Sequence, residues 1–415
     1  MKKYFLLFFL IIFSSSAYSQ YAETIHFTHD GITVNGTISL PSNTGKHPVI
    51  IIVPGSGAND QDGTLQMIGA NIACLYPGLL NQTLRPYKEL ADALVLKGYA
   101  VLRYDKLEYT YSSNISMLNP ITFHKLWLPA ESAINYVKTR TDIDTNAIVL
   151  IGHSEGSSLI PYISHGRNDI KALISIAGPR QPLDSLLAQQ IVYITQTCGG
   201  DTAQAHTQAS QILNYFANIR NNTWNAATPP IFGVSAAAWS DYVQAVDSVS
   251  INYNLCNLPT LFIGFDKDIN VPPAELNRLR NEVIITNDFW SIPDLIHYMT
   301  PDNDPHISKT IADTINYWLG QKNLSVIQTS MRQENIRISP NPFTAQFSVE
   351  ITHVHAKMTT ISLTANDGKL LFEKNYENPS NSFSQKFVYP HLPAGFYYIT
   401  IKEDNRVFTQ KIIKE

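Results

Sequence analysis

The stretch AIVLIGHSEGS, residues 147 to 157, contains the pattern that decides the fold. Its first five residues are apolar without interruption, which is typical of a strand buried on both faces of a parallel sheet. The next five, Gly152 to Gly156, have the spacing Gly-x-Ser-x-Gly, and Ser157 begins a segment that can form a helix. A serine between such a strand and a helix sits on a tight turn, where the flanking glycines relieve a steric clash. The stretch therefore predicts a sharp turn that exposes Ser154 Oγ at the carboxyl end of the sheet.

Residues 21–321 alternate between short apolar runs and segments with helical periodicity. The runs with strand character form a strand pair at 21–40 and single strands at 49–53, 100–104, 172–177, 260–264 and 283–286. The helical segments between them cover 87–97, 124–138 and 307–319. This alternation indicates an α/β fold with a mostly parallel central sheet. A long segment at about 180–250, rich in Ala, Gln and Asn, interrupts the alternation and predicts a helical cap over the active-site end.

The turn serine needs partners, because a serine hydroxyl is a weak nucleophile that requires a base held by a carboxylate. On α/β folds with this serine turn, the three residues follow in the order Ser, Asp or Glu, His. Asp268 comes after the predicted strand 260–264 and stands three residues before Val271. Asp266 lies on the same loop and is the alternative, which we interpret as a solvated loop residue. We therefore expect Asp268 to be the carboxylate.

The base is expected on the loop before the last helix of this domain. His297 lies there, after the predicted strand 283–286. His306 is the alternative at the start of the following helix, where helping the first helical turn or facing solvent is the favoured interpretation. His153, inside the serine turn, is expected to pack beside that turn. His297 is therefore the predicted base, and Ser154, Asp268 and His297 form the predicted catalytic triad, called the relay below.

Attack by the serine places negative charge on the carbonyl oxygen, which needs fixed backbone N–H donors. One donor is expected from Glu155, directly after the serine. The other is expected from the loop after strand 49–53, where the sequence Pro-Gly-Ser-Gly lets the backbone approach a substrate. Ser56 is the preferred donor there, and Gly57 is the alternative. These three residues form the predicted oxyanion site.

The overall composition excludes several classes of protein. The chain has 415 residues, a net charge of −4 and 44% hydrophobic residues, so neither nucleic-acid binding nor general disorder is indicated. Asp60 and Asp62 lack partner ligands for a metal and are interpreted as loop and cap carboxylates, so no metal or cofactor is expected. The three cysteines, Cys74, Cys198 and Cys256, are too few for a disulfide framework. One pair can bridge in an oxidising compartment, but the sequence does not choose the pair.

The amino terminus has the features of a signal peptide. Two lysines precede an apolar run at residues 5–13, which small residues follow up to Ser19. This order predicts a signal peptide over residues 1–19 and a mature chain that starts at Gln20. The run is too short to cross a membrane, which takes about 20 residues, and no later segment is long enough.

The carboxyl-terminal part changes in character after the hydrolase-like segment. Residues 322–335 are polar and without pattern, which predicts a linker between a domain at 20–321 and a second domain at 336–415. The second domain contains short alternating strands at 347–351, 359–364, 370–375, 383–389, 396–401 and 407–413. Such strands, separated by turn residues, predict a small β-sandwich.

Several motifs of the first domain resemble those of a bacterial α/β-hydrolase esterase family related to dienelactone hydrolases and serine aminopeptidase-like hydrolases. They are PGSGANDQDG at 54–63, RPYKELA at 85–91, LRYDK at 102–106 and GHSEG at 152–156. Asp268 and His297 complete the match, which covers about residues 21–321. The resemblance implies hydrolysis of carboxylic esters, with the relay carried over onto Ser154, Asp268 and His297. Residues 107–109 and Ile296 depart from the family pattern, which leaves the substrate preference open.

The last domain resembles the C-terminal sorting domain of the bacterial type IX secretion system. The matching motifs are ISPNPF at 338–343, NDGK at 366–369, LPAGFY at 392–397 and QKIIK at 410–414. The resemblance implies the type IX machinery as a partner and export across the outer membrane, to the medium or the cell surface. A carbohydrate-binding sandwich is the alternative interpretation.

Together these patterns predict a secreted serine hydrolase that acts on a small-molecule ester. A serine peptidase or amidase on the same fold is one alternative, and a non-catalytic surface binding protein is another. Aromatic residues in the predicted cap are candidates for an acyl pocket or, as we favour, for the core of the cap: Tyr193, Tyr215, Phe216, Trp224 and Trp239.

Overall fold

A computed structural model describes most of the chain. The chain divides into two compact units, with the boundary between Asn323 and Leu324. The described residues are 21–29, 31–43, 45–112, 123–322, 324, 336–352, 358–365, 369–377, 382–403 and 406–415. The predicted signal peptide lies outside the described residues, as does most of the predicted linker at 322–335.

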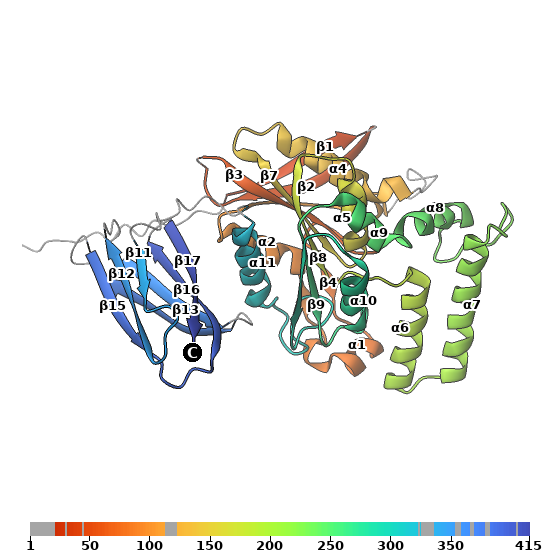
Figure 1. The fold of residues 1–415 in the computed structure, drawn as a ribbon. Helices are drawn as coiled ribbons and strands as arrows, with labels where there is room; N and C mark the ends of the chain where they lie inside the picture. The colour runs from red at the N-terminus through yellow and green to blue at the C-terminus, as the bar shows by residue number, and fades with distance from the viewer. Residues whose placement is uncertain are drawn as a thin grey trace, which may run out of the picture. The chain divides into compact units, whose positions relative to one another are not determined.

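The first unit is built on an eight-stranded sheet with the order β1-β2-β6-β3-β7-β8-β9-β10 (Figure 1). The strands are β1 (Tyr21–His29), β2 (Ile32–Leu40), β3 (His47–Val53), β6 (Ala100–Tyr104), β7 (Ile143–His153), β8 (Ile170–Ile176), β9 (Thr260–Phe265) and β10 (Asn287–Ile292). Strands β1 and β2 are antiparallel to their neighbours. The other six strands, β6, β3, β7, β8, β9 and β10 in sheet order, are parallel to one another. The predicted fold class, an α/β-hydrolase fold with a mostly parallel sheet, is confirmed.

The central strands are apolar because helices cover both faces of the sheet. All seven residues of β3 are buried, as are all six of β9. The covering helices are α2 (Pro86–Val95), α4 (Phe123–Lys138), α5 (Glu155–Ser164), α10 (Ala274–Glu282) and α11 (Lys309–Gln321). Helices α2 and α11 contact each other, and α4 contacts α5. No helix within the described ranges is both long and apolar enough for a membrane crossing.

The sequence-based prediction of a strand at 283–286 is wrong. The last strand of the sheet, β10, covers 287–292 instead. β10 lies at the sheet edge and pairs with β9, so most of its side chains are only partly buried and polar residues are tolerated. The apolar residues before it lie in an irregular segment, in which Ile284 is 85% exposed. An apolar run is therefore a poor guide to an edge strand.

Four helices lie between β8 and β9, in the segment where the sequence predicts a cap at about 180–250, and the last of them ends at Cys256. They are α6 (Leu183–Cys198), α7 (Thr202–Arg220), α8 (Ala236–Val246) and α9 (Val249–Cys256). Asp201 caps α7 by accepting a hydrogen bond from Gln204 N–H, and Gly199 ends α6 with a φ of 80°. Helices α6 and α7 pack against each other as a pair (Figure 1).

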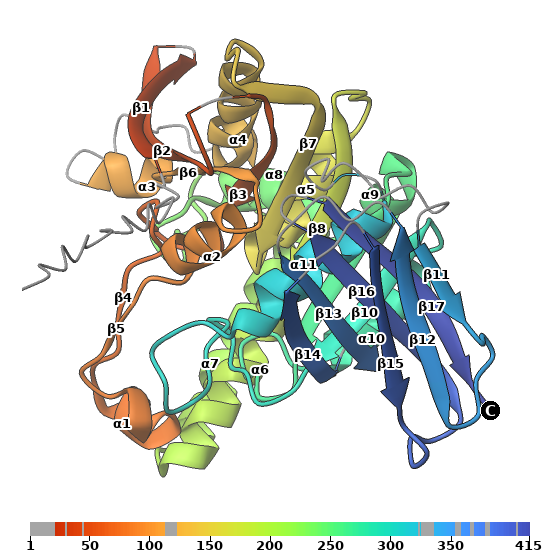
Figure 2. The same cartoon turned by 90° about the vertical axis from the view of Figure 1, so that its left-hand side faces the viewer.

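A short insertion after β3 reaches the cap and is bonded to it. The insertion contains β4 (Leu65–Gln66), α1 (Ala70–Leu75), the 3-10 helix η1 (Pro77–Leu79) and β5 (Thr83–Leu84). Figure 2 shows α1 at its far end, and α1 contacts α6. A disulfide joins Cys74 of the insertion to Cys198 at the end of α6, whereas Cys256 is free. The bond ties the cap to the insertion, and this is the pair that the sequence did not choose.

The second unit consists of two antiparallel sheets, ordered β11-β12-β15 and β14-β13-β16-β17. The strands are β11 (Ile336–Ser339), β12 (Gln346–Thr352), β13 (Met358–Ala365), β14 (Leu370–Glu377), β15 (Ser382–Val388), β16 (Gly395–Glu403) and β17 (Arg406–Lys414). Alternate residues of both sheets, such as Phe347, Val349, Ile361 and Ile399, form one apolar core. The predicted all-β architecture is confirmed, with β11 as a strand that the sequence pattern did not reveal.

Replacing both Cys74 and Cys198 with serine should lower the free energy of unfolding of the first unit by about 2–4 kcal/mol. The bond closes a loop with a sequence separation of 124 residues, which restricts the unfolded chain. Thermal melting with and without a reducing agent measures the effect. The reductant should lower the melting temperature of the wild type and of Cys256→Ala but not that of the double variant. An equal response of all three proteins would contradict the prediction.

Candidate active site

Ser154 occupies a tight turn between β7 and α5. Its φ of 53° and ψ of −120° are unfavourable for a residue with a side chain. A methyl group built on Gly152 would overlap the backbone of Gly156, and one built on Gly156 would overlap Val53 O. The Gly-x-Ser-x-Gly spacing is therefore required by backbone contacts with β3 as well as by the turn itself. The turn leaves Ser154 partly exposed at the carboxyl end of β7.

Asp268 and His297 form a buried hydrogen-bonded pair. Asp268 Oδ2 lies 2.8 Å from His297 Nδ1, and the two residues are 3% and 5% exposed. The other carboxylate oxygen accepts hydrogen bonds from the N–H groups of Asn270 and Val271, both at 2.8 Å. Because a carboxylate only accepts, Nδ1 carries the proton, which leaves His297 Nε2 with a free lone pair. The pair has the arrangement that a general base requires.

The loop that carries His297 lies against the serine turn. His153, the neighbour of Ser154, stacks on the His297 ring with 4.8 Å between the ring centroids. The Ser154 hydroxyl itself makes no hydrogen bond within the described part of the chain. Serine–imidazole contacts of this kind are often long until a substrate binds. The structure thus joins Asp268 and His297 directly, and His153 links the loop of His297 to the serine turn.

His153 connects the serine turn to both neighbouring loops. Its Nε2 lies 2.9 Å from His297 O, a carbonyl that only accepts, so Nε2 carries the ring proton. Its Nδ1 must then accept, and the hydroxyl of Tyr87 donates to it at 2.9 Å. The same hydroxyl accepts the N–H of Gly55, also at 2.9 Å. His153 does pack beside the turn, as the sequence predicts, but it also holds the backbone of His297.

The charge state of His153 follows from its surroundings. Burial, reinforced by the nearby His297, lowers the pKa of His153 from 6.5 to about 3. The ring is therefore neutral at physiological pH, which agrees with the single ring proton that its two hydrogen bonds require.

The predicted oxyanion donors lie on both sides of the serine. A methyl group built on Gly55 would lie 3.2 Å from Ser154 Cβ, so the loop after β3 passes directly beside the nucleophile. Gly55 N–H is occupied by Tyr87, whereas the N–H groups of Ser56, Gly57 and Glu155 have no acceptor among the described residues. Glu155 is the first residue of α5, where backbone N–H groups are left without helical partners. These free donors fit the predicted oxyanion site, and they do not distinguish Ser56 from Gly57.

Four further residues that support the site were not found by sequence reasoning. Lys106 donates to Gly55 O and pairs with Glu155, and Asn59 Nδ2 also donates to Gly55 O. Tyr87 and Tyr242, from α2 and α8, bring hydroxyl groups to the same region. Lys106 lies in the motif LRYDK and Tyr87 in the motif RPYKELA, and these motifs were the sequence signal that pointed to the two residues.

The alternative residues lie elsewhere. Asp266 is exposed, and its side chain accepts the N–H of Asp294 at 2.7 Å. His306 has a 74% exposed side chain that pairs with Glu89 at 3.1 Å. Neither contacts the Asp268–His297 pair in the structure.

The two aspartates after the Pro-Gly-Ser-Gly sequence support loops. Asp60 accepts the N–H groups of Asp62 and Thr64, at 3.1 and 2.8 Å. Asp62 pairs with Arg103 of β6, which is almost completely buried. Both carboxylates thus hold the shape of the loop that contains Ser56.

The cap aromatics mostly pack against one another. Phe216 is completely buried and lies edge-on to Trp239, with 5.1 Å between the ring centroids. Tyr215 also packs on Phe216, and Trp224 packs on the core of the unit. Tyr193 is the exception, with 46% of its surface exposed. These contacts favour the interpretation that the aromatic residues form the cap core.

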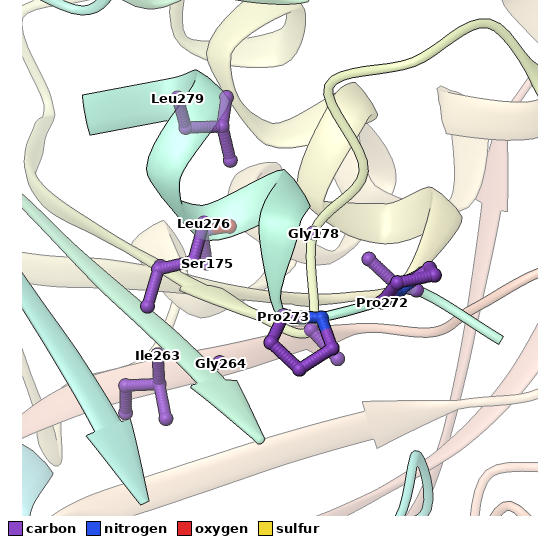
Figure 3. Close-up of a pocket in the computed structure, with 10 residues that line it drawn as sticks. Ser175, Gly178, Ile263, Gly264, Pro272, Pro273, Leu276 and Leu279 are labelled. Atoms are coloured by element: carbon purple, nitrogen blue, oxygen red, sulfur yellow. The ribbon is translucent and has the colours of Figure 1, made fainter. Parts of the chain in front are cut away.

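A small cavity lies beside residues 271–273, which follow Asp268 on the same loop. Figure 3 shows Ser175, Ile263, Pro272 and Leu276 around it. Its volume of about 10 Å³ has room for no more than about one water molecule. The cavity is therefore a packing gap and not a substrate pocket.

Comparison with known proteins found a matching family model for part of each unit. Residues 130–246 match the family model described as BAAT / Acyl-CoA thioester hydrolase C terminal, and residues 337–415 match the secretion system C-terminal sorting domain. Esterase EstD of Thermotoga maritima is 26% identical over 326 residues, which cover 72% of this chain and 69% of that protein. The first unit has an α/β-hydrolase fold, and the second unit matches a secretion sorting domain model.

Solved structures are similar to the α/β-hydrolase domain at low sequence identity. Est1E from Butyrivibrio proteoclasticus has a TM-score of 0.48 and 15% identity, over 72% of this chain and 98% of that one. The acylaminoacyl peptidase of Pyrococcus horikoshii has a TM-score of 0.47 and 12% identity, over 73% of this chain and 42% of that one.

The buried, neutral His153 should make the hydrolase domain less stable in acid. In the unfolded chain this histidine binds a proton below about pH 6.5, whereas in the folded chain it does so only near pH 3. Its contribution is therefore complete above pH 6.5 and is lost at about 1.4 kcal/mol per pH unit as the pH falls towards 3.

Urea denaturation of the wild type and His153→Gln between pH 7 and pH 4 checks this dependence. The variant should lose less stability on acidification than the wild type, whereas the exposed control His306→Gln should follow the wild type. Parallel curves for the wild type and His153→Gln would contradict the prediction.

Proposed function

We propose that this protein is a secreted carboxylic ester hydrolase that works through an acyl-enzyme on Ser154. The buried hydrogen bond between Asp268 and His297, beside the strained serine turn, is the observation that carries the proposal. A buried Asp–His pair that leaves Nε2 free is the arrangement that activates a serine hydroxyl. The name of the Thermotoga maritima relative supports the ester as the bond that is cleaved.

The proposed reaction has two steps. His297 Nε2 takes the proton of the Ser154 hydroxyl as the oxygen attacks the ester carbonyl, and Asp268 stabilises the imidazolium that forms. The N–H groups of Glu155 and of Ser56, with Gly57 as the alternative to Ser56, stabilise the oxyanion. His297 then gives its proton to the departing alkoxide. In the second step it activates a water molecule, which attacks the acyl-serine and releases the acid.

We also propose that the protein reaches the outside of the cell through two signals. Residues 1–19 would direct it across the inner membrane, and the sorting domain at 337–415 would deliver it to the type IX machinery. The disulfide between Cys74 and Cys198 supports an oxidising destination, because such bonds rarely persist in the cytosol.

Ser154→Ala should abolish the turnover of p-nitrophenyl acetate, with a loss of at least about 10⁴-fold in kcat, because no nucleophile remains. Labelling by a fluorophosphonate probe should disappear with it. Ser164→Ala is the matched control: it removes a buried serine hydroxyl without a hydrogen-bond partner at the other end of α5 and should leave both readouts unchanged. A wild type that the probe does not label would refute the proposal and favour a binding protein.

Esters should be cleaved faster than the corresponding amides, because an alkoxide leaves without the nitrogen protonation that an amine requires. Turnover of p-nitrophenyl esters with two to twelve acyl carbons, beside aminoacyl p-nitroanilides, measures this preference. A higher kcat/KM for the anilides would identify a peptidase on the same serine and would contradict the ester assignment.

A further inference from the structure

Lys106 is a buried cation at the carboxyl edge of the sheet. It is 3% exposed and comes two residues after β6, the strand next to β3. Its Nζ donates to Gly55 O at 3.0 Å and pairs with Glu155 Oε2 at 3.0 Å and Glu108 Oε1 at 3.3 Å. An ammonium has three N–H donors, so these three acceptors satisfy it completely. Nothing in this arrangement leaves Lys106 available to contact a substrate directly.

The hydrogen bond from Lys106 to Gly55 O affects the predicted oxyanion donor Ser56 N–H. Gly55 O and Ser56 N–H belong to the same planar trans peptide group and point in opposite directions. Lys106 Nζ and Asn59 Nδ2 both donate to this oxygen, each at 3.0 Å, which fixes the plane of the peptide. The direction of Ser56 N–H is fixed with it. A cationic donor on the oxygen also polarises the peptide and strengthens its N–H as a donor.

The contact with Glu155 bears on the second donor and on the local charge. Glu155 supplies the other free N–H, and its side chain places a carboxylate at the same helix terminus. Oε2 of this carboxylate is paired with Lys106, and Oε1 accepts the hydroxyl of Tyr242 from the cap at 3.2 Å. An unpaired carboxylate there would repel the negative charge that develops on the substrate oxygen. The ammonium opposes this repulsion.

We propose that Lys106 is the positioning residue of the oxyanion site, which it supports by fixing the Gly55–Ser56 peptide as well as by neutralising Glu155. The inference rests on the proposed ester hydrolase function. Strand order explains why this residue can do so: β6, β3 and β7 are adjacent, so Lys106, the loop after β3 and Glu155 meet at one edge.

Steady-state kinetics with p-nitrophenyl acetate on the full chain test the proposal. Lys106→Met should lower kcat about 10- to 100-fold with KM changed less than about threefold. The reason is that the Gly55–Ser56 peptide group stabilises the oxyanion of the transition state and not the bound substrate. The Ki of a trifluoromethyl ketone, which forms an oxyanion on the serine, should rise by the same factor as kcat/KM falls. Arg140→Met is the control. It removes a cation paired with Asp142 and Glu23 near the amino end of β7 and should leave kcat unchanged.

The double variant Lys106→Met/Glu155→Gln separates peptide positioning from charge pairing. Removing the unpaired carboxylate should restore the melting temperature and leave kcat low. A kcat that returns to the wild-type value would overturn the proposal, since Lys106 would then act only as a counterion. If Lys106→Met does not fold, Lys106→Arg replaces it: this variant keeps the charge with another geometry, and an unchanged kcat would overturn the proposal. A wild type without activity would instead refute the hydrolase function itself.

Discussion

Gly152 and Gly156 flank the turn at Ser154, and the surrounding backbone leaves no room for a side chain on either glycine. Gly156 lies against Val53 O, and a methyl group built on Gly55 in the loop after β3 would lie 3.2 Å from Ser154 Cβ. This close approach places the free N–H groups of Ser56 and Glu155 on two segments that touch at the nucleophile. The strain of the positive φ at Ser154 is held by the packed helix and strands around it. The rest of the site is arranged around this turn.

The order of the parallel strands in the sheet places the other functional groups of the site. The parallel strands β6, β3, β7, β8, β9 and β10 are consecutive neighbours, and every residue of the proposed mechanism follows the carboxyl end of one of them. Asp268 follows β9 and His297 follows β10, so the two side chains meet at one edge. The neutral His153 joins the loops through hydrogen bonds to the His297 carbonyl and to the Tyr87 hydroxyl, and it adds no charge to the site.

Much of this arrangement could be predicted because its signals are local. Unbroken apolar runs reveal strands buried on both faces, and Asp268 follows such a run by a few residues. The strand predicted at 283–286 was wrong because an edge strand is polar on its exposed side. Lys106 could not be found from spacing, since its partners Gly55 and Glu155 lie 51 and 49 residues away and only strand order brings them together. The disulfide partners were equally hidden, because the fold of the insertion decides which cysteine meets α6.

The central claim is that Ser154, activated by His297, carries the acyl group during turnover. Rapid acid quenching of the enzyme with p-nitrophenyl acetate, followed by peptide mass spectrometry, tests it most directly. The account predicts one acetyl group on the peptide that contains Ser154, formed together with a burst of p-nitrophenol. In His297→Asn the acetylated peptide should form far more slowly. Turnover with no acetyl group on Ser154, or with acetylation of another residue, would contradict the account.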